Sequence, residues 1–277
     1  MHYVGVIFNP LSENAQQLAE ALGGWLQNQK LNFWVGSAQE AVANSSTLEG
    51  VELLVVLGGD GTVLQAMRVA LQQEAPILAV ALGRLNFMAE LTPSQLPSSL
   101  QTIFAGGGWA DQRALIHVKL YRQDVVIAEF HALNEVVVSR GEGSHVVWVE
   151  VEIDAIPLIT YRADGVLVAT ATGSTAYALS AGGPVVDPRS QALILVPVAA
   201  HLAPISAMVL HEDSIITLAL RNRHHAVLTI DGMETVSLQE SDKVAVCRSS
   251  KSCSFVRVQP PAQFYSSLTQ RLQRSLR

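Results

Sequence analysis

The chain has 277 residues, of which 49% are hydrophobic and 15% charged, and its formal net charge is −6. This composition predicts a compact globular protein and argues against disorder. The negative charge argues against a nucleic-acid partner, which needs a basic surface. Only Cys247 and Cys253 are present, too few for a disulfide framework or a four-cysteine zinc site. Without a targeting signal or an apolar run that could span a bilayer, we expect a cytoplasmic protein that binds no membrane.

Strands and helices alternate in the first part of the chain. Apolar runs predict strands at 4–8, 33–35, 53–57 and 77–82, and helical spacing predicts a helix over 13–29, with a polar segment up to Gly50. The alternation predicts a parallel sheet with right-handed crossovers. Ligands of such sheets bind beyond the carboxyl ends of the strands.

The central feature is the turn Gly58-Gly59-Asp60-Gly61-Thr62, which joins the strand 53–57 to an amphipathic helix. Glycines allow backbone N–H groups to approach a ligand closely, and a helix N-terminus suits phosphate oxygens. Asp60 is an acid where phosphate is expected, so it would bind a hydroxyl, a metal ion or both. This combination indicates phosphoryl transfer to an alcohol. The alternative is a tight connection in which Asp60 only caps the helix.

Helical periodicity fades after Gly106-Gly107-Gly108, and two-residue alternation takes over from Leu115 onward, as in Val147, Val149 and Val151. We therefore expect an α/β N-terminal nucleotide-binding domain at 1–110, followed by an antiparallel β-rich, sandwich-like domain at 111–260. Residues 261–277 are expected to form a C-terminal helix, with exposed arginines at Arg271, Arg274 and Arg277.

Two motifs stand out in the β-rich half. Asn134-Glu135 precedes a valine run, and an adjacent amide and carboxylate can bind a ribose diol. Residues 163–188 combine many hydroxyls and glycines around a strand and a helix start, which indicates contacts to a polar ligand. Neither a Walker A sequence nor a GxGxxG fingerprint occurs.

Taken together, these motifs resemble those of the NAD kinase family. The resemblance rests on GGDGT at 58–62, LNF at 85–87 in place of the family's LGF, Asn134-Glu135, TGSTAYALSAGGP at 172–184 after Asp164-Gly165, and Asp231-Gly232. Lipid kinases, and more loosely phosphofructokinases, share the GGDG turn alone. The motif TGSTAY together with Asn134-Glu135 is much more specific.

The resemblance implies an enzyme that phosphorylates NAD with ATP and Mg²⁺, or another divalent cation. It also implies a homodimer or homotetramer in which a neighbouring subunit completes the dinucleotide site. Asp60 would bind or activate the 2′-hydroxyl of the adenosine ribose. The residues implied to bind NAD are Gly61, Phe87, Asn134, Glu135, His145, Asp164, Thr175, Ala176, Tyr177 and Ser180. Those implied to hold the phosphates of ATP are Gly58, Gly59 and Thr62, and no side chain is assigned to a metal.

Four positions depart from the family pattern, namely Ala81, Asn86, Ala171 and Ser206. Those at Ala81 and Ser206 remove polar or cationic groups that could hold phosphates, which keeps open a catalytically weak homologue that binds NAD or NADPH for regulation. A lipid kinase is disfavoured because it leaves Asn134-Glu135 and TGSTAY without a role. The apolar run 192–200 and the segment 201–210 are either an internal strand or a subunit interface, and the pattern does not separate these two alternatives.

Overall fold

The computed structural model describes residues 1–83, 86–141, 145–201, 204–221 and 225–275, without the side chains of residues 270 and 272–275. Leu85 of the LNF motif and Arg277 therefore lie outside the described residues, as does the side chain of Arg274. The chain divides into two compact units, one made of Met1–Gln112 and Cys253–Arg277 and the other of Arg113–Ser252. None of the described helices is long and apolar enough to cross a membrane.

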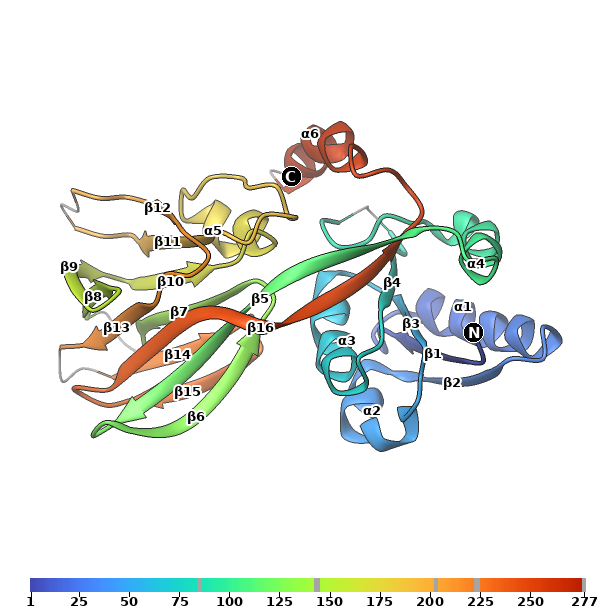
Figure 1. The fold of residues 1–277 in the computed structure, drawn as a ribbon, viewed down its shortest axis with the longest axis horizontal. Helices are drawn as coiled ribbons and strands as arrows, with labels where there is room; N and C mark the ends of the chain where they lie inside the picture. Colours follow the sequence, from blue (N-terminus) through green and yellow to red (C-terminus); the bar gives the residue numbers. More distant parts are fainter. Residues whose placement is uncertain (84–85, 142–144, 202–203, 222–224, 276–277) are drawn as a thin grey trace. The chain divides into compact units, whose positions relative to one another are not determined.

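A parallel sheet forms the centre of the first unit (Figure 1). Its strands lie in the order β2 (Asn32–Ser37), β1 (Tyr3–Phe8), β3 (Leu53–Leu57) and β4 (Ile77–Val80). All three neighbouring pairs are parallel, as the alternation of strands and helices predicts. Strand β3 is buried along its whole length, which explains its continuous apolar run.

Helices cover this sheet. Helices α1 (Glu13–Asn28) and α4 (Leu96–Phe104) share one hydrophobic core with the strands. Helix α3 (Asp60–Gln73) contacts β3, β4 and α2 (Ala38–Ala43). The sequence did not predict α2, the 3₁₀ turn η1 (Ser45–Leu48) or α4. Helix α2 is short, but Ser37 and Glu40 form a capping box at its start, which stabilises a single isolated turn.

The second unit consists of two antiparallel β layers with a shared core. One layer has the order β12 (Met208–Leu210), β11 (Leu193–Val198), β10 (Gly165–Ala169), β7 (Glu135–Arg140), β14 (Ala226–Ile230) and β15 (Glu234–Leu238). The other contains β5 (Trp109–Arg122), β6 (Val125–Ala132), β8 (Val147–Ile153), β9 (Ile156–Ala163), β13 (Ile216–Leu220) and part of β16 (Lys243–Arg257). The expected α/β and β-rich fold class is confirmed.

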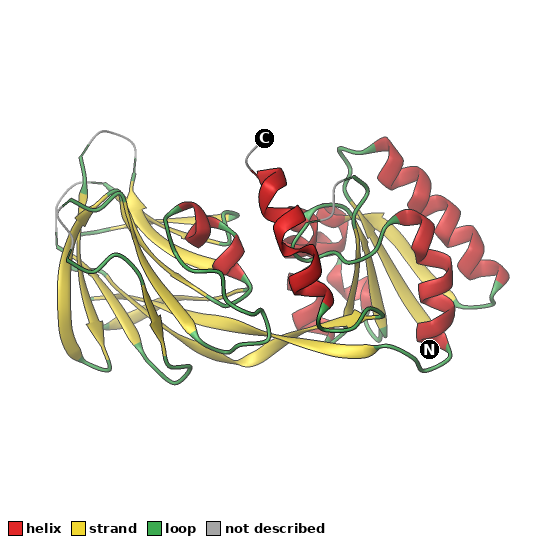
Figure 2. Ribbon diagram, turned by 90° about the horizontal axis from the view of Figure 1, so that it is seen from above, coloured by secondary structure: helices red, strands yellow, loops and turns green. Residues whose placement is uncertain are grey.

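Short helical segments cover the outer face of the six-stranded layer. The 3₁₀ turn η3 (Gly173–Thr175) and helix α5 (Tyr177–Ser180) follow β10, and Ala178 packs on Leu167 and Ile194. Figure 2 shows that the second unit is otherwise built from strands and loops. The TGSTAY motif thus forms a compact turn against the sheet.

Three further sequence expectations can be compared with the structure. The apolar run 192–200 contains β11, which pairs with β10 and β12 on its two sides and is therefore an internal strand. Residues 253–260, expected with the β-rich domain, belong with the first unit, where Phe255 of β16 pairs in parallel with Ile77. The terminal helix, expected over 261–277, is observed as α6 (Gln263–Ser275).

Candidate functional site

Asp60 is the first residue of α3, but it does not cap that helix. Gly59 occupies the N-cap position, and no side chain makes a capping hydrogen bond. The Asp60 carboxylate instead accepts a hydrogen bond from the backbone N–H of Met88 at 3.2 Å. The alternative that Asp60 serves only as a helix cap is therefore wrong.

Burial dominates the electrostatics of Asp60. It raises the pKa of this carboxyl, while the N–H groups of Met88 and Phe87 and the charge of Arg271 act in the opposite direction. A carboxyl whose pKa lies above its ordinary value accepts protons more readily than a solvated aspartate. A raised pKa is the direction that general-base catalysis by a carboxylate requires.

The glycines around Asp60 have different roles. Gly58 is buried, and a Cβ there would collide with the Thr62 side chain. Gly59 and Gly61 are exposed, and a Cβ on either would meet open space. The packing of Thr62 on Gly58 fixes the turn, and the exposed glycines leave the backbone open to a ligand.

The loop after β4 places Phe87 and Met88 near Asp60. Asn86, which replaces the family's glycine, accepts hydrogen bonds through Oδ1 from the N–H groups of Met88 at 3.2 Å and Ala89 at 2.7 Å. Such an asparagine turn stabilises the loop by side-chain bonding. Asn86, which departs from the family pattern, therefore stabilises the conformation of the loop that contains it.

Arg271 of α6 holds the same loop, and the expectation that it is exposed is wrong. Its side chain is buried, at 8% exposure, and Nη1 donates to the Phe87 carbonyl at 3.2 Å. The guanidinium lies 5.8 Å from the centre of the Phe87 ring. Helical spacing alone placed Arg271 on a solvent face because the sequence did not reveal that this helix packs on the loop.

A buried ion pair supports the loop from its other side. Arg257 Nε donates to Asp111 Oδ2 at 3.0 Å, and its Nη1 donates to the Met88 carbonyl at 2.7 Å. Both charged side chains are at most 6% exposed. Met88, whose N–H donates to Asp60, is thus also hydrogen-bonded to Arg257 of β16, the last strand.

In the second unit, Asn134 and Glu135 carry buried acceptors. Asn134 Oδ1 and Glu135 Oε2 have no hydrogen-bond partner within the described residues. Burial, followed by the charge of Asp231, raises the pKa of Glu135 to about 7. Because buried polar atoms are nearly always paired, two unpaired acceptors side by side indicate a place for a hydrogen-bonding ligand.

The TGSTAY motif packs against this pair. A Cβ on Gly173 would collide with the backbone of Asn134, so only glycine allows the close approach. The N–H of Tyr177 faces the Glu135 carboxylate and lowers its pKa. Four expected ligand contacts are at least partly accessible in this segment, namely Thr175, Ala176, Tyr177 and Ser180.

Two residues that are expected to contact NAD, Asp164 and His145, do not lie beside Glu135 within one chain. In the pairing of β7 with β10, Glu135 lies opposite Ala169, whereas Asp164 immediately precedes Gly165 at the other end. Asp164 lies five residues along the strand from Ala169, a distance of about 17 Å at about 3.3 Å per residue. Asp164 forms an ion pair with Arg140 at 2.8 Å. His145 is exposed two residues before Val147, which pairs with Ala163 beside Asp164, so it lies toward this same end.

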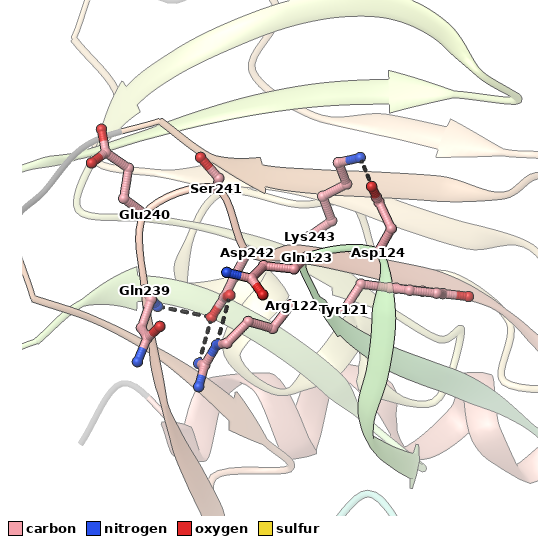
Figure 3. Close-up of a pocket in the computed structure, with 9 residues that line it drawn as sticks. All are labelled: Tyr121, Arg122, Gln123, Asp124, Gln239, Glu240, Ser241, Asp242 and Lys243. Atoms are coloured by element: carbon pink, nitrogen blue, oxygen red, sulfur yellow. Dashed lines mark hydrogen bonds and ion pairs between the residues drawn. The ribbon is translucent and has the colours of Figure 1, made fainter.

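A separate pocket of about 210 Å³ lies in the second unit (Figure 3). It is formed by the turns that follow β5 and β15, and its charged groups pair with one another, Arg122 with Asp242 and Lys243 with Asp124. None of the residues expected to bind nucleotide lines it. A typical small-molecule pocket is larger, about 300–1,000 Å³.

Comparison with known proteins identifies the family. The ATP-NAD kinase N-terminal domain matches residues 32–108, and the ATP-NAD kinase C-terminal domain matches residues 133–258. The NAD kinase of Chloroflexus aurantiacus is 51% identical over 272 residues, which is 98% of this chain and 99% of that protein. The NAD kinase of Dehalococcoides mccartyi is 38% identical over 270 residues, 97% of this chain and 95% of that protein.

Two solved structures have the same fold. Yeast NADH kinase complexed with NADH superimposes with a TM-score of 0.83 at 23% identity, over 99% of this chain and 88% of that one. An NAD kinase from Archaeoglobus fulgidus in complex with ATP has a TM-score of 0.77 at 23% identity, over 98% of both chains. With both family domains matched and close relatives aligned over nearly their full length, this chain belongs to the NAD kinase family.

Proposed function

We propose that the chain transfers the γ-phosphoryl group of ATP to the 2′-hydroxyl of the adenosine ribose of NAD, giving NADP and ADP. The observation that carries this proposal is the state of Asp60. Its carboxylate lies in a glycine turn, makes no capping bond to the helix and has a raised pKa. A helix cap needs none of this, whereas a base for an alcohol does.

In the proposed reaction, Asp60 accepts the proton of the 2′-hydroxyl. The ribose oxygen forms a bond to the γ-phosphorus as the bond between that phosphorus and the β,γ-bridging oxygen breaks, and ADP leaves. Phosphoryl transfer depends mainly on positioning and charge neutralisation. The N–H groups of Gly59 and Gly61, with Thr62 and the close-packed Gly58, would hold the phosphate oxygens.

Mg²⁺ is proposed to enter as the counter-ion of ATP. Among the described residues, no group of three histidine, cysteine, aspartate or glutamate side chains could hold a metal ion. Magnesium is commonly bound by one or two carboxylates together with the phosphates of the substrate. The ion would neutralise phosphate charge, while the chain itself orients the acceptor hydroxyl.

NAD is proposed to bind through the second unit and Phe87. The unpaired acceptors of Asn134 and Glu135 suit ribose hydroxyls, which donate hydrogen bonds. Tyr177 and its neighbours would line the adenine and ribose pocket, with Phe87 and Gly61 also contacting the nucleotide. Asp164 and His145 lie apart from Glu135 within one chain, which supports a homodimer or homotetramer whose neighbouring subunit supplies them.

The direct test is to incubate the purified protein with NAD, Mg²⁺ and ATP and to assay NADP by an NADP-specific dehydrogenase. Parallel reactions with NADH and with polyphosphate determine the acceptor and the donor. Binding of NAD without turnover would favour the regulatory homologue. Phosphorylation of sphingosine or diacylglycerol without NADP formation would favour the lipid kinase.

A further inference from the structure

Asp231 connects the turn between β14 and β15 to the residues that open β7. Its Oδ2 accepts the N–H of Leu133 at 2.8 Å, and its Oδ1 accepts the N–H groups of Asn134 at 2.8 Å and Glu135 at 3.0 Å. Its own backbone N–H donates to the Glu135 carbonyl at 2.9 Å. One residue therefore makes four hydrogen bonds to three consecutive residues far away in the sequence.

An aspartate is well suited to this position. The ionised carboxylate offers two oxygens and no donor, so it can accept from three N–H groups at once. An asparagine would direct its own N–H groups at backbone donors. The backbone of Asp231 is left-handed, with a φ of +49°, and Gly232 follows with a φ of +68°. Among residues other than glycine, aspartate and asparagine tolerate this conformation best.

The segment held by Asp231 is also fixed from its opposite side. The Thr170 hydroxyl donates to the carbonyl of Leu133, and the Thr170 N–H donates to the carbonyl of Asn134 at 2.8 Å. The N–H groups are thus held by Asp231 and two of the carbonyls by Thr170. Among the described residues, the side chains of Asn134 and Glu135 in this segment keep one unpaired acceptor each.

We propose that Asp231 is a positioning residue for dinucleotide binding, which holds the backbone of residues 133–135 so that Asn134 and Glu135 present their acceptors to the substrate in one orientation. This inference rests on the proposed function, because it takes the Asn134-Glu135 pair to bind NAD. Asp231 itself is 8% exposed and has its oxygens occupied by backbone donors, so it acts through the pair.

The electrostatics agree with the geometry. Burial raises the pKa of Asp231 to about 6, while the three N–H groups of Leu133, Asn134 and Glu135 lower it. At neutral pH the side chain is therefore mainly a carboxylate, which is the form that accepts from all three donors. The negative charge of Asp231 also raises the pKa of Glu135, in addition to the effect of burial.

The test compares D231N with a matched control, D154N. Asp154 also lies in a hairpin turn with positive φ, +53°, and its Oδ1 accepts the N–H of Ile215 at 2.8 Å, but it has no bond to residues 133–135. We expect D231N to raise the dissociation constant for NAD about 10- to 100-fold in calorimetry, the range that follows from the loss of a hydrogen bond to a charged group. D154N should leave that constant within twofold of the parent, and the KM for ATP should change little in both.

A second measurement separates positioning from general loss of structure. Hydrogen exchange of the amides of residues 133–135 should accelerate in D231N while the core strand β10 stays protected. A double-mutant cycle with N134A should be non-additive, because both changes act on the same contact. If D231N does not fold, D231S, which keeps one acceptor, takes its place in the same comparison.

The proposal is overturned if D231N binds NAD as tightly as the parent, or if D154N weakens binding equally. It is also overturned if the losses from D231N and N134A simply add. Failure of the proposed function has a different signature, since the unmodified protein would then neither bind NAD nor form NADP. The two failures are therefore distinguished by the parent protein alone.

Discussion

Arg271 donates a hydrogen bond through Nη1 to the carbonyl of Phe87, across 184 residues of sequence. This bond places a buried cation near Asp60, and the positive charge of Arg271 lowers the pKa of that carboxyl against the effect of burial. At Ala81 and Ser206, by contrast, this chain lacks polar or cationic groups that the family pattern has. The C-terminal helix thus brings a cation to the loop beside the glycine turn.

Replacing Arg271 with glutamine should shift the acid limb of the kcat profile to higher pH. Without the positive charge, the pKa of Asp60 rises, so a higher pH is needed to ionise the base. R271K keeps the charge and should restore much of the profile, whereas R189Q, at an exposed arginine paired with Asp187, should leave it unchanged. An acid limb in R271Q identical to that of the parent would contradict this role.

Replacing Asp60 with asparagine should lower kcat by about 10²–10⁴-fold, because the amide keeps the shape but cannot accept the hydroxyl proton. The fold should persist, since Asp60 makes no capping bond to α3. The dissociation constant for NAD, measured by calorimetry, should change little. If D60N kept most of its turnover, the proton would have to leave by another route.

Replacing Glu135 with glutamine should stabilise the protein at alkaline pH. Folding raises the pKa of Glu135 from 4.5 to about 7 through burial and Asp231. The folded state therefore holds more protons than the unfolded state between these values, and the free energy of unfolding falls as pH rises through that window. The loss in the free energy of unfolding has an upper bound on the order of 3 kcal/mol, at about 1.4 kcal/mol per pKa unit.

Urea denaturation at pH 4 and pH 8 tests this expectation. E135Q should match the parent at pH 4 and exceed it at pH 8, while its affinity for NAD falls because an acceptor is lost. E49Q, at an exposed glutamate, should follow the parent at both values. A pH dependence of stability that is the same in E135Q and in the parent would show that Glu135 titrates normally.

The edge strand β12 offers a test of self-association. Val209 is 54% exposed, whereas its neighbour Met208 packs against the core of the second unit. If a neighbouring subunit covers this edge, V209D should lower the mass in light scattering and weaken NAD binding together, with little change in stability. M208D should instead destabilise the fold.

V125D is the matched control for V209D, because Val125 is a 63% exposed valine on the edge strand β6. We expect it to leave the mass unchanged. A parent protein that is monomeric and fully active at assay concentration would exclude a shared dinucleotide site. An unchanged mass in V209D would move the interface away from β12.

The sequence predicts what is encoded locally. Strand β3, the glycine turn and α3 follow one another without interruption, so apolar run, glycines and helical spacing are enough to place Asp60 at the start of the helix. The alternation of Val147, Val149 and Val151 likewise predicts a half-buried strand, and these three side chains are buried. Local patterns thus determine the elements that carry the motifs.

The supporting contacts could not be predicted in the same way. Asp231 binds residues almost a hundred positions earlier, and the sequence indicated only that its Asp-Gly pair fits the family pattern, without a role for the carboxylate. Arg271 follows the helical spacing of a solvent face, and only the packing of α6 on the loop buries it. Long-range hydrogen bonds leave no periodicity, so the residues that position the motif side chains were the ones missed.

The discontinuity of the first unit has a consequence for folding. Residues 253–277 are synthesised after residues 113–252, yet Arg257 neutralises the buried carboxylate of Asp111 and Arg271 holds the loop beside Asp60. Residues 113–252 are continuous in sequence, so the contacts within the second unit can form before residues 253–277 have been made. We therefore expect the β-rich unit to complete its fold before the first unit, although the first unit begins earlier in the chain.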